Sequence, residues 1–166
     1  MNDNEKLRQD RLIFYSADIE RIEAVLKELV SLSSAKCALL IDKEGHMVAR
    51  TGATRSFDVD TISALVAGSF AATKEMARLL GEDEFSILFH QGVRDSIQLQ
   101  LIGDRTLLAV LFDERTNLGL VRFYAQEASR HLTSIFGDIL NREPQANGGL
   151  SSDFSADAAA ALDNLF

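Results

Sequence analysis

Three histidines and one cysteine are the residues of this chain whose chemistry best suits metal binding or nucleophilic attack. His46, His90 and His131 stand far apart and match neither H-E-x-x-H nor a zinc pattern with paired cysteines. Cys37 begins an apolar run, which predicts a buried thiol and therefore a poor nucleophile. We expect neither a metal site nor a catalytic cysteine.

Other catalytic and cofactor motifs are also missing from the sequence. The ten glycines form neither G-x-G-x-x-G nor the G-x-x-x-x-G-K-[ST] phosphate loop, and no G-x-S-x-G elbow occurs. The acidic run at residues 82–84 lacks the ligand spacing of a calcium loop. These patterns predict a protein that is not an enzyme, has no catalytic residue and needs no cofactor.

Net charge and hydropathy exclude some classes of binding partner. The chain has 17 basic and 25 acidic residues, a net charge of −8, which disfavours nucleic acid and anionic membranes because both require neutralisation of phosphate. No apolar run approaches the ~18 residues of a membrane span, and the N-terminus does not read as a signal peptide. We therefore expect a cytoplasmic protein without membrane insertion.

A long helix predicted over residues 58–80 organises the chain. Asp58 is its predicted N-cap and Gly81 its C-cap. One stripe of this helix is apolar and is expected to form the core: Ile62, Leu65, Ser69, Ala72, Met76 and Leu79, flanked by Val66 and Leu80. The other stripe has small residues in its N-terminal half and charged ones after it: Ala64, Ala67, Gly68, Ala71, Lys74, Glu75 and Arg78.

Gly68 is the least expected residue of that second stripe. A glycine in a helix interior costs about 1 kcal/mol relative to alanine. It therefore indicates either close approach of another backbone, hence a docking surface, or a tolerated substitution.

The remaining elements predict an α+β sandwich of order αββαβββα, with a five-stranded antiparallel sheet flanked by helices. A helix begins near residue 16, and a hairpin over residues 37–51 turns at Gly45. Strands follow at 85–91, 96–102 and 106–112, and a helix runs to about residue 141. The last strand is apolar throughout and is predicted to be central, whereas strand 85–91 is predicted at a sheet edge. The middle strand alternates, so its polar side is expected to meet water or polar groups.

Composition divides the chain into four segments. Residues 1–11 are predicted to be disordered, 12–142 to form the domain, 143–154 to be a flexible linker and 155–166 to form a short amphipathic tail helix. Such a helix is marginal alone, so it is expected to dock in a groove of a partner or of its own chain. Its docking residues are Ala158, Ala161, Leu162, Leu165 and Phe166.

Several segments in this order resemble the Roadblock family, and within it the MglB group of bacterial proteins that regulate the Ras-like GTPase MglA. They are residues 40–45, 65–68, 79–85 and 112–122. The likeness covers about residues 12–141, and the C-terminal Leu-Asp-Asn-Leu-Phe also looks like the tail of that group.

The resemblance implies a homodimer. In this family the central helices of two chains pack side by side and neighbouring edge strands pair into one sheet. Carried over to this sequence, the homodimer interface comprises Ala64 and Gly68 of the helix and Ile87, Leu88 and Phe89 of the edge strand.

The resemblance also implies a partner, a GTP-bound Ras-like small GTPase of the MglA type. Its contact residues would be Ala67, Ala71, Lys74, Glu75 and Arg78, with Glu75 departing from the small residue expected there. The dimer would stimulate GTP hydrolysis in cell polarity or motility, without an arginine finger, and the tail would contact a second site on the GTPase.

Three alternatives stay open at this point. An arginine finger is compatible with the composition, and its candidates are Arg55, Arg78, Arg94, Arg115 and Arg122. The chain could instead be a scaffold that binds a GTPase or another complex without activating hydrolysis. A small-molecule sensor domain is the third alternative, disfavoured by the lack of polar clusters in the apolar elements.

Overall fold

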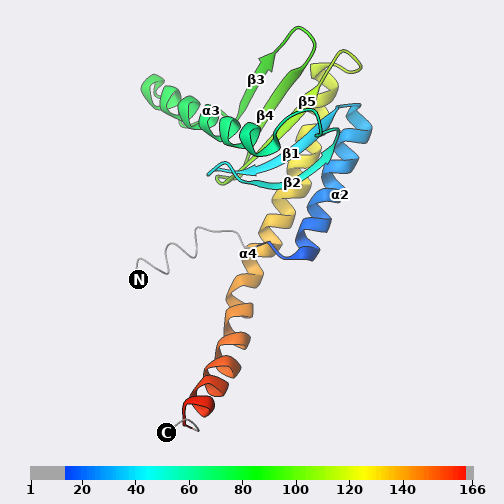
Figure 1. Cartoon of the computed structure of the whole chain (residues 1–166). Helices are drawn as coiled ribbons and strands as arrows, with labels where there is room; N and C mark the ends of the chain where they lie inside the picture. Colours follow the sequence, from blue (N-terminus) through cyan, green and yellow to red (C-terminus); the bar gives the residue numbers. More distant parts are fainter. Residues whose placement is uncertain (1–13, 164–166) are drawn as a thin grey trace. The chain divides into compact units, whose positions relative to one another are not determined.

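A computed structural model describes the backbone of residues 14–163 and the side chains of residues 14–141. This part of the chain folds into a five-stranded antiparallel sheet and three helices, which confirms the predicted fold class (Figure 1). The predicted disordered segment 1–11 lies outside the described residues. In chain order the elements are α2 (Ser16–Ser33), β1 (Cys37–Asp42), β2 (Met47–Gly52), α3 (Val59–Leu80), β3 (Ile87–Gln91), β4 (Ser96–Ile102), β5 (Thr106–Phe112) and α4 (Leu118–Asp163).

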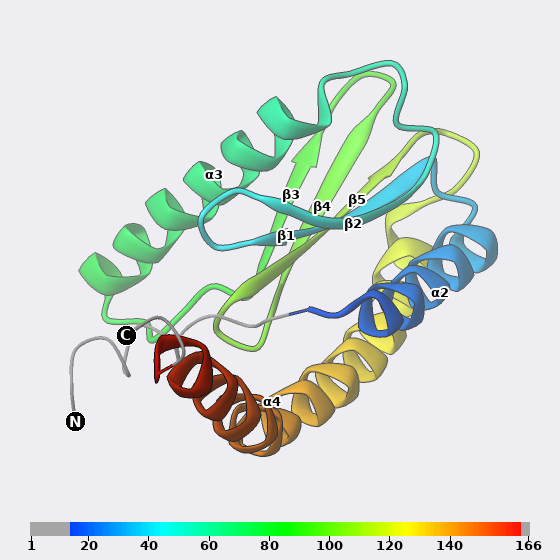
Figure 2. The ribbon, with the colours of Figure 1, turned by 60° about the horizontal axis from the view of Figure 1, so that its bottom comes forward.

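The strand order is β2-β1-β5-β4-β3. It confirms that β5 is central and that β3 lies at an edge. Tyr15–Ile135 form one compact unit, in which α3 covers one face of the sheet while α2 and the first part of α4 cover the other (Figure 2).

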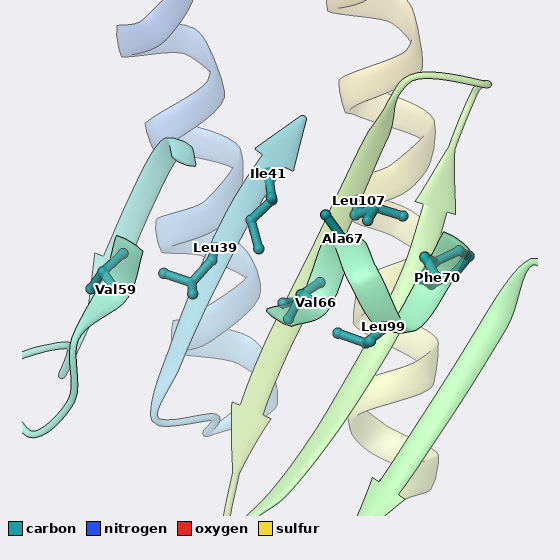
Figure 3. Packing of buried hydrophobic residues seen from close by; sticks show 9 residues of the cluster. Leu39, Ile41, Val59, Val66, Ala67, Phe70, Leu99 and Leu107 are labelled. Carbon is teal, nitrogen blue, oxygen red and sulfur yellow. The ribbon is translucent and has the colours of Figure 1, made fainter. Parts of the chain in front are cut away.

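The face of the sheet beneath α3 is a continuous apolar core (Figure 3). The strands contribute Leu39, Ile41, Leu99, Leu107 and Ala109. The helix contributes Val59, Val66, Ala67 and Phe70. Burial of these side chains fixes the rotation of α3 about its axis, because apolar burial of about 25 cal/mol per Å² outweighs helix propensity.

On the face of β4 that points away from α3, one prediction is wrong. Gln98 is only 1% exposed, and neither its amide nitrogen nor its carbonyl oxygen has a hydrogen-bond partner within the described residues. It pairs in register with Phe89 and Val110, and Phe89 stacks on Phe112 at 6.1 Å between ring centroids. The expected contact with water is wrong for Gln98, because helices cover this face as well.

The turn between β1 and β2 shows why residue 45 is glycine. Gly45 has φ of +95°, as predicted, and a Cβ built there would lie 3.0 Å from the Cα of Ala64. The Asp42 carboxylate accepts hydrogen bonds from the amides of Glu44 (3.0 Å) and His46 (2.9 Å). The turn therefore packs directly against the N-terminal half of α3.

The C-terminal helix is longer than the sequence predicts. Its backbone is helical from Leu118 to Asp163, through residues 143–154 where a linker is expected, so the predicted tail helix is the last part of α4. Pro144 removes one helical hydrogen bond, and Gly148 and Gly149 lower helix propensity, but neither change forbids a continuous helix. The domain boundaries stay a prediction. Within the described residues, no helix is long and apolar enough to cross a membrane.

Candidate functional site

The candidate site is the outward face of α3, and both ends of that helix are tightly defined. The Asp58 carboxylate caps it, accepting hydrogen bonds from the amides of Asp60 (3.0 Å) and Thr61 (3.3 Å) and from the Thr61 hydroxyl (2.9 Å). The Thr61 hydroxyl is the main cause of a lowered pKa of Asp58, and the two amides add to it. Gly81 ends the helix in the left-handed conformation with φ of +77°. Both predicted caps are confirmed.

The buried face of α3 is not the stripe that the sequence predicts. It contains two hydroxyl residues, Ser63 and Thr73, which donate to the carbonyls of Val59 (2.7 Å) and Ser69 (2.9 Å) one turn earlier. Their polar groups are thereby satisfied inside the helix, so they can face an apolar core without an unpaired donor. The full buried stripe is Val59, Ser63, Val66, Ala67, Phe70, Thr73 and Ala77.

Large apolar residues of α3 that are predicted to be core lie outside. Leu65 is 62% exposed, Met76 52%, Leu79 77% and Leu80 72%. Placing these four side chains in the core is wrong, because the helix is rotated to bury Val66 and Phe70 instead. Sequence reasoning missed them as surface residues, although apolar residues on more than one stripe of a helix indicate contacts on both sides.

Most residues predicted for the site do lie on the outward face of α3. Ala64, Gly68, Ala71, Lys74, Glu75 and Arg78 are exposed. The exception is Ala67, which is 8% exposed and belongs to the core against the sheet, so its predicted outward position is wrong. The reason is the same rotation, which turns residue 67 inward beside Val66.

The environment of Gly68 limits how its presence can be explained. A Cβ built at this position would meet no atom within 4 Å. No other backbone of the described chain therefore requires a glycine there, and a close approach would have to come from another molecule.

The C-terminal half of the face is charged. Arg78 is held by Glu75, whose carboxylate lies 3.1 Å from Nε and 3.0 Å from Nη2 one helical turn away. Both side chains are about two-thirds exposed, so this ion pair orients the guanidinium and adds little stability. Lys74 has no ion-pair partner within residues 14–141.

Strand β3 exposes its outer backbone edge, since it pairs only with β4 in the described chain. Its predicted interface residues have different surroundings. Ile87 is 42% exposed, Leu88 packs against the core beneath α3, and Phe89 stacks on Phe112 on the other face. Ile87 therefore offers a side chain to a partner, whereas the strand as a whole offers its backbone hydrogen-bonding groups.

The histidines and the cysteine belong to parts of the chain other than α3. The Nδ1 atom of His46 is 3.3 Å from a carboxylate oxygen of Asp42 and 3.9 Å from one of Glu44, a grouping that the histidine count alone does not predict. The D-x-E-x-H spacing around a glycine turn would have been its signal in the sequence. Cys37 is fully buried, as predicted, and burial raises the pKa of its thiol to about 11.

Two of the five arginine-finger candidates are already paired. Arg78 is held by Glu75, and Arg115 donates through Nε and Nη2 to the two carboxylate oxygens of Asp113 at 3.0–3.2 Å. The Arg115 side chain is the main cause of a lowered pKa of Asp113. The other three, Arg55, Arg94 and Arg122, are exposed.

The tail residues can be placed only in part. Ala158, Ala161 and Leu162 belong to the last turns of α4, where only the backbone is described, and Leu165 and Phe166 lie outside the described residues. Their docking stays a prediction.

Comparison with known proteins shows which family and which solved structures this chain resembles. The Roadblock/LC7 domain family matches residues 21–112. Among solved structures, Myxococcus xanthus MglB is 39% identical with a TM-score of 0.73, over 77% of this chain and 96% of that chain. Gliding protein MglB from Thermus thermophilus is 38% identical with a TM-score of 0.71, over 76% and 96% of the two chains. An MglB with a tetrameric arrangement is 36% identical with a TM-score of 0.71, over 77% and 96%.

Proposed function

Because the chain belongs to the Roadblock/LC7 domain family, with MglB proteins among its relatives, we propose that it is a homodimeric regulator of a bacterial Ras-like GTPase. It binds the GTP-loaded, MglA-type GTPase and stimulates GTP hydrolysis. The name of the Thermus relative, a gliding protein, supports a role in motility.

The observation that carries the proposal is the second apolar face of α3. Leu65, Met76, Leu79 and Leu80 are each more than half exposed beside the small residues Gly68 and Ala72. Exposed apolar side chains gathered on one helix face mark a protein contact. A helix that already covers its own sheet is expected to use this face for another chain.

A second copy fits this face in an antiparallel, two-fold arrangement. The N-terminal end of α3 has Asp58 and Asp60, whereas the C-terminal half has Lys74 and Arg78. Antiparallel packing of two α3 helices about Gly68 brings the acidic N-terminal end of each near Lys74 and Arg78 of the other, of which Arg78 already pairs with Glu75. In the same arrangement the β3 edges of the two chains pair, which would remove an exposed edge.

The GTPase contact is proposed on the remaining exposed residues of the face. Ala71 and Glu75 form its centre, with Lys74 and Arg78 beside them. Ala67 supports this contact indirectly, because it packs in the core beneath α3 and helps to hold the helix in place. Because two copies present the same residues around a two-fold axis, a single GTPase bound near the axis would contact them asymmetrically.

Activation is proposed to work without an arginine finger. Arg78 and Arg115 pair with carboxylates of their own chain, which orients the two guanidinium groups toward those carboxylates. The other three candidates, Arg55, Arg94 and Arg122, lie outside α3. The dimer instead holds the GTPase in a conformation where the GTPase's own catalytic groups align with the γ-phosphate. The tail at the end of α4 contacts a second site and raises the local concentration of the two partners.

Single-turnover phosphate release from a GTP-loaded MglA-type GTPase tests the proposal. We expect this chain to increase the rate of hydrolysis in proportion to complex formed, with no hydrolysis when the GTPase is omitted. Binding without any increase over the intrinsic rate would support the scaffold alternative, and absence of binding would refute both readings.

A further inference from the structure

A hollow between α2 and α4, on the side of the sheet opposite α3, has no role in the function proposed above. Its volume is about 240 Å³, and its floor is formed by the half-buried Val25 and the buried Leu29 and Ala128. We propose that it is a docking groove for a helical segment of another protein, with an apolar anchor residue flanked by lysines or arginines.

The walls of the groove have the composition of an anchor site. Leu32 on α2 is 50% exposed and Phe123 on α4 is 59% exposed. The Phe123 ring meets Tyr124 edge-on at the rim, with centroids 5.1 Å apart. Leucine and aromatic side chains bordering an apolar hollow are the features that receive an anchor residue from a partner helix.

The volume of the hollow favours an apolar side chain over a small molecule as its occupant. Small-molecule sites in proteins usually enclose roughly 300–1,000 Å³ and bury most of the ligand. A hollow of about 240 Å³ between two helices is smaller than that range and accommodates one or two large apolar side chains. A third helix laid along α2 and α4 would supply them at helical spacing.

Acidic residues at the rim of the groove favour basic residues on either side of the anchor in the partner helix. Glu28 on α2 and Glu127 on α4 stand on opposite walls, and Glu28 has no ion-pair partner within residues 14–141. Glu127 pairs with Arg130 at 3.1 Å but remains 43% exposed. His131 is the one other ionisable group with a side chain on the groove, apart from the Tyr124 phenol, among the residues that the structure describes. Lysine or arginine on the partner therefore meets Glu28 on one wall and the partly exposed carboxylate of the Glu127–Arg130 pair on the other, whereas an acidic segment is repelled by Glu28.

The chain's own C-terminal segment is the less suitable occupant for the same reason. Residues 151–166 contain Asp153, Asp157 and Asp163 and no lysine or arginine. Docking it here would place like charges against Glu28 and Glu127.

The test uses two fluorescent peptides about four helical turns long. They share one leucine and phenylalanine face and differ only in having lysine or glutamate on the flanks. Fluorescence anisotropy with the full-length chain should show saturable binding of the lysine peptide. Phe123→Ala, a change at an exposed position, should weaken it at least about tenfold. Glu28→Lys/Glu127→Lys should abolish that binding and instead favour the glutamate peptide.

A matched control separates groove recognition from general attraction to an acidic protein. Glu82→Lys/Asp83→Lys changes the net charge equally, in the loop after α3, and should leave the affinity for the lysine peptide within about twofold. Equal binding of both peptides by the native chain would overturn the proposal. So would equal loss in the two double variants, or unchanged binding by Phe123→Ala.

Discussion

Neighbouring residues of α3 with similar side chains have opposite surroundings. Ala67 is buried against the sheet, whereas Ala71, one turn later, is exposed beside Glu75. Substitution of Ala67 should therefore change the stability of the fold, whereas substitution of Ala71 should change the binding of a partner.

Ala71→Arg/Glu75→Arg is expected to abolish GTPase binding and leave the homodimer and the fold intact, because both side chains point away from the sheet. Calorimetry with the GTP-loaded GTPase and light scattering of the free variant measure the two effects. As the matched buried control, Ala67→Arg should lower the free energy of unfolding by at least about 2 kcal/mol, since a charge is forced into the core. Monomers of the double variant would mean that residues 71 and 75 belong to the self-interface.

Cys37 provides a prediction on pH. Its thiol is buried and its pKa is about 11 against an ordinary value of 9.0, so at pH 8 the folded chain holds about a hundredfold less thiolate than the unfolded chain. Alkylation by iodoacetamide should be slower by at least that factor until urea unfolds the chain. Because burial disfavours the thiolate, this group leaves the free energy of unfolding unchanged below about pH 9 and lowers it as the pH rises from 9 toward 11. Rapid alkylation of the folded protein at pH 8 would contradict the burial.

At the scale of elements, the contact between the β1–β2 turn and α3 decides which glycines matter for the fold. Gly45 combines φ of +95° with a backbone atom of Ala64 3.0 Å from its built Cβ, whereas Gly68 has open space around it. The first glycine is explained inside the chain, and the second is not.

Gly45→Ala should lower the free energy of unfolding by roughly 1–3 kcal/mol, because the added methyl group meets the α3 backbone in a conformation alanine disfavours. Gly68→Ala is the comparison: with both glycine substitutions made in the Leu65→Glu/Leu79→Glu monomer, where no second chain packs about Gly68, it should stabilise the helix by up to about 1 kcal/mol. Urea denaturation at one protein concentration measures both. Equal effects would show that the turn does not press on α3 as closely as its geometry indicates.

For the whole molecule, the central question is what covers the outward face of α3. Leu65 and Leu79 are the most exposed of its apolar residues apart from Leu80, and a chain that left them in water would be prone to associate through them. An isologous dimer covers the face of both copies at once.

Leu65→Glu/Leu79→Glu should therefore convert the dimer to a folded monomer, seen by light scattering with an unchanged circular dichroism spectrum. Val93→Glu, at a fully exposed position in the turn between β3 and β4, is the control and should remain dimeric. A double variant that stays dimeric would place the self-interface elsewhere, and one that unfolds would mean that the two leucines support the chain's own fold.

Deleting residues 150–166 should weaken the complex with the GTPase or slow nucleotide exchange without unfolding the domain, because the sheet core lies wholly within Tyr15–Ile135. Binding and exchange are measured with a fluorescent guanine nucleotide, and thermal unfolding of the free chain is the control. If affinity and exchange rate both stay unchanged, the tail has no role in the GTPase contact.

The sequence by itself determined the order of elements, the central place of β5, the edge position of β3 and the caps of α3. These features depend on local patterns: an uninterrupted apolar strand, a carboxylate before a helix, a glycine after it. Local hydrogen bonding and propensity act within a few residues, so such patterns carry over directly into the structure.

Only the tertiary structure decided which face of α3 meets the sheet. Apolar periodicity marks a face that avoids water, but it cannot say whether the chain itself or another molecule covers that face. In α3 the core stripe includes Ser63 and Thr73, whose hydroxyls bond to the helix's own carbonyls, while Leu65 and Leu79 stay outside. Gln98 is the same case on β4, a polar residue buried because helices cover both faces of the sheet. Packing across the whole unit determined both the orientation of α3 and the burial of Gln98, and no local sequence pattern contains that information.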